Sequence, residues 1–293
     1  MEFGLFGINM GPLSDPGAAI KIARTAESAG FDSLWAGEHV VLPDPQVAPS
    51  PLPPTYPMLD PNICFAWLAG QTTTIRLGTG IIILPQRNPL VLAKEMASLD
   101  VLSNGRLIFG VGIGYLKAEF DALGIPFKHK AARTVEYLEA MQAIWSQETP
   151  SYQGQFVRFD GIQALPRPLQ QPGGPPLVFG GHVAAAYERS VALAQGWYGF
   201  GLTLEKTAEC LAGLRSAAER VERPPELGRL EISVTPFGDI DIETARHYAE
   251  LGVDRLITLF PTQNSGELFS SSATVSEVDD YIKHLGDSVV GRV

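Results

Sequence analysis

The sequence has few of the features that mark secreted, membrane-bound or nucleic-acid-binding proteins. Its 293 residues include only two cysteines, Cys64 and Cys210, which excludes a disulfide framework and indicates buried free thiols. No run of lysine and arginine is present and the formal net charge is -10, so neither nucleic acid nor membrane is an expected partner. No segment approaches the ~20 apolar residues of a membrane span, and no signal peptide precedes the first strand. We therefore expect a cytoplasmic protein.

Several catalytic signatures are also missing. Histidines and carboxylates are not clustered with ligand spacing, so no metal site is expected, and no Ser-His-Asp motif is recognisable. The glycine run at Gly110, Gly112 and Gly114 is neither a Rossmann fingerprint, whose third glycine is replaced by Tyr115, nor a P-loop, because it lacks the Gly-Lys-Ser/Thr ending. A site with few acids and bases suits hydride or electron chemistry carried by an organic cofactor.

The sequence does contain a regular alternation of strand and helix patterns. We expect strands at Glu2–Ile8, Phe31–Ala36, Ile75–Ile83, Arg106–Val111, Leu177–Gly180, Trp197–Phe200, Glu231–Pro236 and Asp254–Phe260. We expect helices from Pro16 to Gly30, between strands three and four, and at Asn62–Thr72, Arg133–Ser146, Val183–Ala194, Leu204–Val221, Ile242–Leu251 and Val275–Leu285. Eight strands that are mostly followed by helices predict a (β/α)8 barrel, with an open doubly wound sheet as the rival.

Two insertions interrupt the expected single domain of residues 1–293. A proline-rich loop at 41–61 is too long to be a simple connector, and loops of this length are usually functional or mobile. A second insertion at about 150–176 alternates polar with aromatic or apolar residues, which predicts a hairpin followed by a stiff return. Neither insertion breaks the strand and helix alternation.

The carboxyl ends of the strands form the active face of such a barrel. Two glycine turns lie there, Gly112–Gly114 and Gly180–Gly181, and such turns expose backbone N–H groups that bind phosphate. The alternative is that the glycines only allow strand and helix to pack closely. His182 follows the second turn at a helix N-terminus, where it either contacts phosphate or is simply exposed.

His39 is the one strong acid and base candidate on this face. It follows the second strand directly, next to Glu38, and an ordinary histidine pKa near 6.5 suits proton transfer. The alternative is a histidine that only fixes the following loop by hydrogen bonds. Glu38 itself assists His39, contacts a cofactor or is a solvated charge at the rim.

Three segments resemble the luciferase-like monooxygenase superfamily, and most closely its branch that uses the deazaflavin coenzyme F420. They are GFDSLWAGEHV from Gly30, GTGIIILPQRNPLVLAKEMASLDVLSNGRLIFGVGIG from Gly78 and PPLVFGGHVAAAYERSVALAQGWYGF from Pro175. The resemblance extends from about Phe3 to Phe200, and more loosely to the eighth strand. It implies a (β/α)8 barrel with an insertion, usually a homodimer.

The resemblance also assigns roles to residues of this chain. It implies a non-prolyl cis peptide at Gly80-Ile81, where a bulge supports the cofactor ring together with Ile83. The implied phosphate contacts are Gly112, Ile113, Gly114, Gly180 and Gly181, with Tyr115 and His182 beside them. His39 takes the position of the catalytic histidine, and Glu38 that of the acidic residue touching the deazaflavin. Tyr115 stands where sugar-phosphate dehydrogenases of this branch carry glutamate, which favours a reductase or another alcohol as substrate.

Three functional hypotheses follow. The first is hydride transfer between F420 and a small organic substrate, with His39 moving the proton and Tyr56, Phe200 and Phe260 as apolar walls. The second is an FMN-dependent monooxygenase that a separate flavin reductase supplies with reduced flavin. The third is a barrel that binds a flavin without turnover. The sequence leaves the substrate and the reaction direction open.

Overall fold

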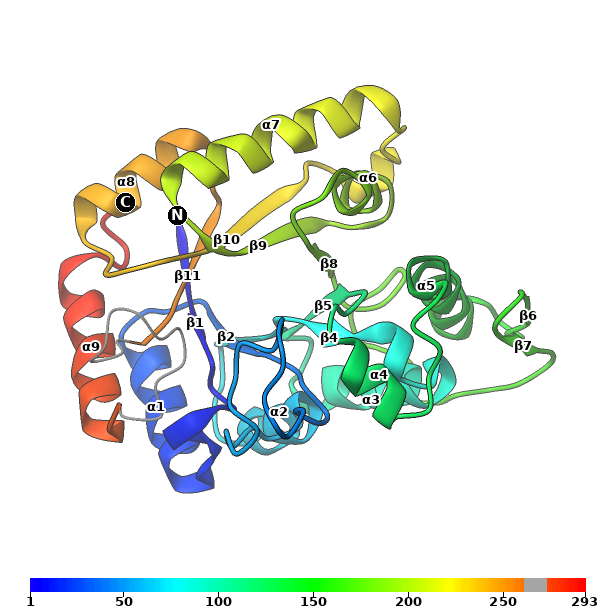
Figure 1. Cartoon of the computed structure of the whole chain (residues 1–293), viewed down its shortest axis with the longest axis horizontal. Helices are drawn as coiled ribbons and strands as arrows, with labels where there is room; N and C mark the ends of the chain where they lie inside the picture. The colour runs from blue at the N-terminus through cyan, green and yellow to red at the C-terminus, as the bar shows by residue number, and fades with distance from the viewer. Residues whose placement is uncertain (261–272) are drawn as a thin grey trace.

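Parallel strands and helices alternate along the chain and close into a barrel (Figure 1). The computed structural model describes residues 1–260 and 273–293. The barrel strands are β1 (Glu2–Phe6), β2 (Ser33–Ala36), β3 (Arg76–Thr79), β4 (Ile82–Ile83), β5 (Leu107–Gly112), β8 (Leu177–Gly180), β9 (Gly196–Leu202), β10 (Glu231–Pro236) and β11 (Arg255–Thr258). Their order is β3-β2-β1-β11-β10-β9-β8-β5-β4, and an additional β3–β5 pairing closes the ring. This closure confirms the predicted (β/α)8 barrel and excludes the open sheet.

The helices surround this barrel. They are α1 (Pro16–Ser28), α2 (Pro61–Ala69), α3 (Pro89–Leu102), α4 (Lys117–Ala122), α5 (Lys130–Ser146), α6 (Ala184–Leu193), α7 (Leu204–Arg220), α8 (Ile242–Leu251) and α9 (Val275–Ser288), with 3-10 turns η1 (Gly11–Ser14), η2 (Leu84–Gln86) and η3 (Pro225–Leu227). The helix predicted from Pro16 is α1, and Asp15 caps it by accepting a hydrogen bond from the Ala18 N–H, with Pro16 in the first turn. The short helix α4 was not predicted, and α5 begins before Arg133.

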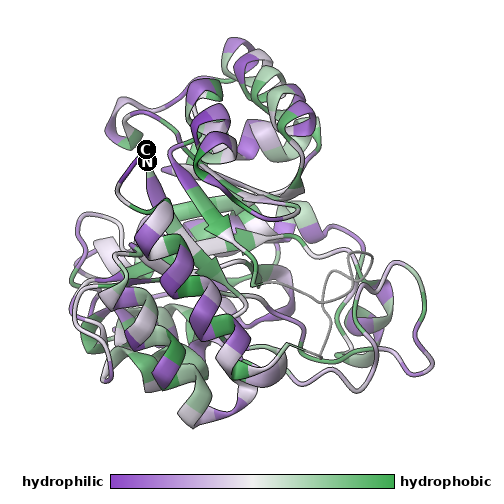
Figure 2. Cartoon of the chain, turned by 90° about the vertical axis from the view of Figure 1, so that its left-hand side faces the viewer, coloured by the Kyte–Doolittle hydropathy of each residue, from purple (hydrophilic) through white to green (hydrophobic). Residues whose placement is uncertain are grey.

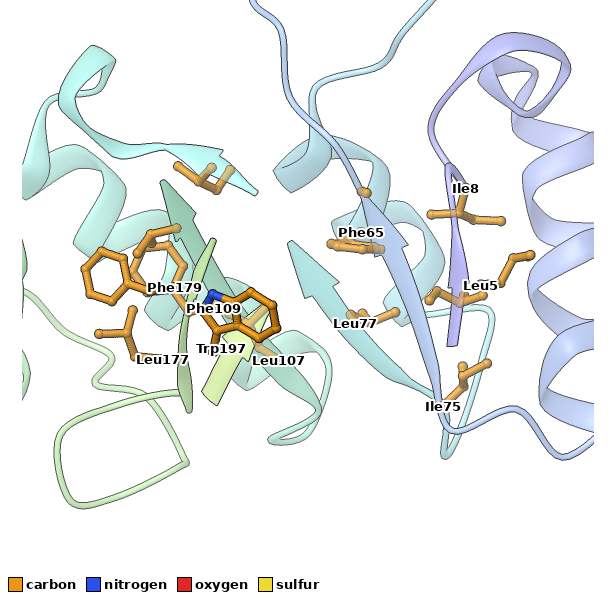
Figure 3. Packing of buried hydrophobic residues seen from close by; sticks show 14 of the residues in the cluster. Leu5, Ile8, Phe65, Ile75, Leu77, Leu107, Phe109, Leu177, Phe179 and Trp197 are labelled. Atoms are coloured by element: carbon orange, nitrogen blue, oxygen red, sulfur yellow. The ribbon is translucent and has the colours of Figure 1, made fainter. Parts of the chain in front are cut away.

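Successive residues along the strands belong alternately to two hydrophobic clusters, one outside and one inside the barrel. Side chains such as Leu5, Phe109 and Phe179 point outward and pack under the helices (Figure 3). Their neighbours Phe6, Ile108 and Val178 belong to a second cluster inside the barrel. Figure 2 shows the same arrangement, with hydrophobic strands inside and hydrophilic stripes on the outer helix surfaces.

The third predicted strand differs from the prediction, because Ile75–Ile83 is not continuous. Residues Gly80 and Ile81 separate β3 from β4, and the peptide bond between them is cis, as the resemblance implied. Gly78 pairs with Ile108 and Ile82 with Val111, so one extra residue lies on the β3–β4 side. This is a β-bulge, which a run of apolar residues does not reveal.

The two insertions lie in different places. The second contains the predicted hairpin in a short form, with β6 (Tyr152–Gln153) antiparallel to β7 (Arg158–Phe159), beyond α5 in Figure 1. The predicted loop 41–61 has no helix or strand of its own up to residue 60, because α2 begins at Pro61. It packs over the carboxyl end of β1, where Met58 pairs with Met10. The chain ends meet at the opposite end of β1, where the Met1 amino group donates a hydrogen bond to the Val293 carbonyl at 2.8 Å.

The cysteines, the helix lengths and the grouping of possible metal ligands complete the description of the fold. Cys64 and Cys210 are both buried free thiols, as predicted. Across residues 1–260 and 273–293, no helix is both long enough and apolar enough to cross a membrane. Within the same residues, no three histidine, cysteine, aspartate or glutamate side chains form a group that would hold a metal ion.

Candidate active site

The bulge at Gly80-Ile81 shapes the carboxyl end of the barrel between β2 and β5. The Thr79 hydroxyl donates to the Gly110 carbonyl at 2.7 Å and accepts from the Gly110 N–H at 2.8 Å. These two bonds connect β3 to β5 at the point where the regular ladder is interrupted. A buried side chain therefore supplies the backbone partners that the bulge removes, and it fixes the position of Ile81.

The glycine run makes room for this bulge. A Cβ atom at Gly110 would lie 1.8 Å from the Thr79 carbonyl oxygen, and one at Gly112 would lie 2.6 Å from Ile81 Cδ1. A Cβ atom at Gly114, where φ is +70°, would lie 2.6 Å from Ile83 Cγ2. Close packing therefore requires these three glycines. Phosphate binding by the Gly112–Gly114 turn stays a prediction beside this structural role.

Glu38 is buried and engaged by protein groups. Its carboxylate accepts hydrogen bonds from the Ile83 N–H and from the Arg87 guanidinium, which also pairs with Asp60 at 2.5 Å. Burial raises the pKa of the Glu38 carboxyl, and the Arg87 charge and the Ile83 N–H oppose this rise. Glu38 thus holds the turn after β4, and a direct contact between Glu38 and a cofactor stays a prediction.

His39 lies between two side chains that follow β5. Its Nδ1 is 3.1 Å from Glu119 Oε2 and its Nε2 is 3.2 Å from the Tyr115 hydroxyl. The second Glu119 oxygen accepts from the Val40 N–H at 2.6 Å. The Glu119 side chain is fully buried, that of His39 is 9% exposed, and Tyr115 is half-exposed. The three side chains form a connected network from the protein interior to the rim of the barrel, which we call the His39 network.

Sequence reasoning missed Glu119. The only local signal was a carboxylate directly before the apolar Phe120, in the short helix α4 that follows Tyr115. Its partner His39 is 80 residues away in the chain, so only the fold brings the pair together. Arg87 and Thr79 were missed for the same reason.

The loop 41–61 contributes an apolar wall. Leu52 and Tyr56 are buried in the cluster inside the barrel, against which Phe200 and Met58 also pack. Asn9 fastens this loop, because its side-chain amide donates to the carbonyls of Gly37 and Leu59. Of the three predicted walls, Tyr56 and Phe200 belong to this cluster, whereas Phe260 belongs to the outer one.

Two basic side chains accompany the glycine turns. The half-buried Lys130 ammonium donates to the Gly114 carbonyl at 2.5 Å and lies 3.8 Å from the centre of the Phe127 ring. Burial lowers the pKa of this amine. At the second turn His182 is exposed, and its Nε2 accepts from the Phe200 N–H at 3.1 Å. In neutral His182 the Nδ1 atom therefore carries the hydrogen and is the ring's donor.

The structure gathers the predicted residues at one end of the barrel. Glu38 and His39 follow β2, Gly80, Ile81 and Ile83 flank the bulge, Gly112, Ile113, Gly114 and Tyr115 end or follow β5, and Gly180, Gly181 and His182 end or follow β8. A family model described as luciferase-like monooxygenase matches residues 1–284 of this chain. The chain belongs to the luciferase-like monooxygenase family.

The chain is also similar to individual curated proteins. The chain is similar to an uncharacterised protein of Mycobacterium tuberculosis, with 31% identity over 277 residues that cover 91% of this chain and 94% of the relative. It is also similar to the oxygenase component of a flavin-dependent trigonelline monooxygenase of Acinetobacter baylyi, with 30% identity over 184 residues covering 60% of this chain and 48% of that protein.

A solved structure extends the comparison at the level of the fold. An F420-dependent secondary alcohol dehydrogenase, in complex with an F420-acetone adduct, superposes with a TM-score of 0.78 at 15% identity. The superposition covers 98% of each chain. With the family match over residues 1–284, the protein is an enzyme of the luciferase-like oxidoreductase and monooxygenase class.

Proposed function

We propose that the protein transfers a hydride between coenzyme F420 and a small organic substrate, and that the His39 network moves the accompanying proton. The observation that carries this proposal is the orientation of the His39 ring, which has a buried carboxylate on one nitrogen and a half-exposed phenol on the other. Hydride transfer to or from a carbonyl, alcohol or polarised double bond requires exchange of a proton. An imidazole that is held in this way suits that task.

We expect a planar ring with a phosphate-bearing tail to bind at the carboxyl end of the barrel. Ile81 projects from the bulge, and Phe6 and Phe200 pack with ring centres 5.0 Å apart beside it in the cluster inside the barrel. The Lys130 ammonium next to Gly114 offers positive charge where the resemblance puts phosphate. F420, when bound, supplies the hydride chemistry that the side chains of the protein lack.

Within this proposal the residues of the chain have separate tasks. Glu38 binds Ile83 and Arg87 on either side of the turn after β4, and so keeps the neighbouring ring-supporting bulge in position. The turns Gly112–Gly114 and Gly180–Gly181, with Ile113 and His182, hold the tail, whereas Tyr115 belongs to the His39 network. The loop 41–61 covers the substrate and excludes water.

The second candidate is an FMN-dependent monooxygenase that a separate reductase supplies with reduced flavin. The similarity to the trigonelline monooxygenase oxygenase component favours it, although that similarity covers less than half of the relative. The same apolar bulge and glycine turns would hold FMN. Oxygen would then replace direct hydride exchange between cofactor and substrate.

A homodimer is part of the proposal. The neighbouring helices α2 and α3 expose apolar side chains, among them Ile63 at 70%, Trp67 at 51% and Leu102 at 62%. Such a patch is typical of an interface between subunits. Sedimentation equilibrium of the purified protein would test for the dimer.

A binding titration separates the two cofactors. Purified protein is titrated with F420 and with FMN side by side, and the quenching of tryptophan fluorescence is followed. We expect F420 to bind at least about tenfold more tightly, which corresponds to about 1.4 kcal/mol. Tighter binding of FMN, together with oxygen consumption on addition of reduced FMN, would replace the proposal by the monooxygenase. Binding of neither would contradict both.

A further inference from the structure

Both ring nitrogens of His39 are occupied by groups of the protein. Nδ1 faces Glu119 Oε2 at 3.1 Å, and Nε2 faces the Tyr115 hydroxyl at 3.2 Å. The two aromatic rings meet nearly at right angles, with an interplanar angle of 86°. In this arrangement no ring nitrogen of His39 is left for direct contact with a substrate.

The chemistry of Glu119 fixes the direction of the hydrogen bonds. An ionised carboxylate only accepts, and Glu119 Oε1 already accepts from the Val40 N–H. Nδ1 of His39 must therefore donate to Oε2, so Nε2 of the neutral imidazole carries no hydrogen. The Tyr115 hydroxyl is then the donor to Nε2, and one lone pair of its oxygen remains available.

Tyr115 is also the member of the network that reaches solvent. It is 48% exposed, whereas Glu119 is 1% exposed. We propose that Tyr115 is the catalytic residue that exchanges a proton with the substrate, that His39 stores this proton, and that Glu119 is a positioning residue that sets the His39 tautomer. This inference deepens the proposed function and rests on it, and it selects substrates with a reacting hydroxyl or carbonyl oxygen.

The proton and electron balance is simple for an alcohol. The carbinol C–H bond breaks, and the hydrogen leaves with its electron pair to F420, which is the oxidant. The hydroxyl proton passes to Tyr115 Oη while the Tyr115 proton passes to His39 Nε2. The O–H bonding pair becomes the second bond of the C=O group, so the products are a carbonyl compound, reduced F420 and an imidazolium that faces the Glu119 carboxylate. Reduction of a carbonyl uses the same groups in reverse, with reduced F420 as the reductant.

The Tyr115 phenol stays protonated before the reaction. Burial raises the pKa of Tyr115 to about 12, and the nearby Glu119 charge adds to this rise. The phenol therefore holds its proton until Nε2 accepts it in the same step in which the substrate releases one. This fits a relay and does not fit a free phenolate base.

The tautomer of His39 tests the proposal without any substrate. We would record nitrogen-15 NMR spectra of histidine-labelled protein at about pH 8.5, some two units above the ordinary histidine pKa. The His39→Asn variant identifies the His39 signals. We expect the Nδ1–H tautomer in the wild type, and an Nε2–H tautomer would overturn the proposal.

Two variants sharpen this test. Glu119→Gln has one acceptor oxygen, which the Val40 N–H retains, so its NH2 group turns to Nδ1 and the hydrogen moves to Nε2. Tyr115→Phe should shift the Nε2 signal and leave the tautomer unchanged. The matched control is Tyr152→Phe, because Tyr152 bonds to Glu139 on the hairpin side of the molecule and should leave His39 unchanged. Unchanged His39 spectra in both test variants would overturn the relay.

Addition of F420 then distinguishes this inference from the proposed function. Saturating F420 should shift the His39 Nε2 signal in the wild type, because the relay borders the cofactor site. Binding of F420 without such a shift would overturn the relay and leave the hydride transfer of the proposed function standing. If F420 does not bind, the proposed function fails, while the tautomers still report whether the hydrogen-bonded network exists.

Discussion

At the amino end of the barrel a buried arginine is enclosed by carboxylates, whereas at the carboxyl end a buried carboxylate is coupled to a half-exposed phenol through a histidine. Arg255 is fully buried and pairs with Glu2, Asp32 and Glu231, which lie at or next to the starts of three strands. Glu119 is equally buried, but its partner His39 leads on to Tyr115 at the rim.

The difference lies in where each network ends. Every branch of the Arg255 network ends in a carboxylate at or next to the start of another strand, and the most exposed of them, Glu2, has a side chain that is 52% exposed. These charges hold strands together at the amino end. The His39 network ends in a hydroxyl group that a ligand can reach. In (β/α)8 barrels the carboxyl-terminal face carries the chemistry and the opposite face carries stability. Substitutions at the two ends should therefore separate stability from activity.

The largest effect is expected for Arg255→Met. Burial raises the pKa of Asp32 to about 6 even with Arg255 beside it, so three carboxylates without the arginine would repel one another or take up protons. We expect the free energy of unfolding to fall by about 3–5 kcal/mol, measured by urea denaturation.

Arg229→Met is the matched control for this substitution. Arg229 pairs with Asp254 at 2.7 Å, but its side chain is 73% exposed, so a loss below about 1 kcal/mol is expected. Equal losses of unfolding free energy in the two variants would show that the buried Arg255 network stabilises the protein no more than an exposed ion pair does.

Tyr115→Phe should have the opposite profile. It removes the hydroxyl of a half-exposed ring, so stability should change by less than about 0.5 kcal/mol. We expect kcat to fall about 100-fold with KM nearly constant, on a small alcohol or ketone that a substrate screen with F420 identifies. A change in KM alone would place Tyr115 in substrate binding only, and Tyr152→Phe should leave both constants unchanged.

The sequence predicted the barrel because each strand and helix has its own local pattern. The cis bond at Gly80-Ile81 was implied by the family resemblance, and it is present. The two charge networks were not predicted, because their partners are distant in the chain. Arg255 and Glu2 are 253 residues apart, and His39 and Glu119 are 80 apart. Periodicity says which side chains are buried, but it does not say which buried charges meet.

The glycine run shows a different limit of sequence reasoning. Its place at the carboxyl end of β5 was predicted correctly, but two interpretations were open. The structure demonstrates the packing role, because Ile81 and the Thr79 carbonyl occupy the space beside Gly110 and Gly112. This packing role does not decide about phosphate binding, because a glycine that is needed for packing can also expose its N–H group to a ligand. Phosphate binding by the same turn therefore stays a prediction.

Lys130→Ala tests that turn, with a smaller effect than the substitutions above. The Lys130 ammonium lies against the Gly114 carbonyl, so its removal takes away the positive charge nearest to the expected phosphate. We expect affinity for F420 to fall about tenfold, or about 1.4 kcal/mol, in the fluorescence titration. Lys128→Ala, which removes an exposed lysine two residues earlier, should change affinity less than about twofold. Similar losses in both variants would indicate general charge attraction and no specific contact.

The smallest effect is expected at Glu27, which completes the comparison from the amino end. Burial raises the pKa of Glu27, but hydrogen bonds from the Thr74, Ile75 and Thr73 N–H groups outweigh it and lower the pKa to about 2. The pKa of Glu27 in the folded protein lies below the ordinary value of 4.5, so the stabilisation by its carboxylate is complete above about pH 4.5 and is lost as the pH falls toward 2.

We expect Glu27→Gln to lower the free energy of unfolding by about 1 kcal/mol at neutral pH, after allowance for solvent screening. Because the neutral variant no longer titrates, its difference from the wild type should shrink as the pH falls from about 4.5 to 2, when urea denaturation is repeated across this range. A difference that stays constant with pH would assign the loss to packing just before β3. The control Glu219→Gln, at an exposed position of α7, should not differ from the wild type anywhere in this pH range.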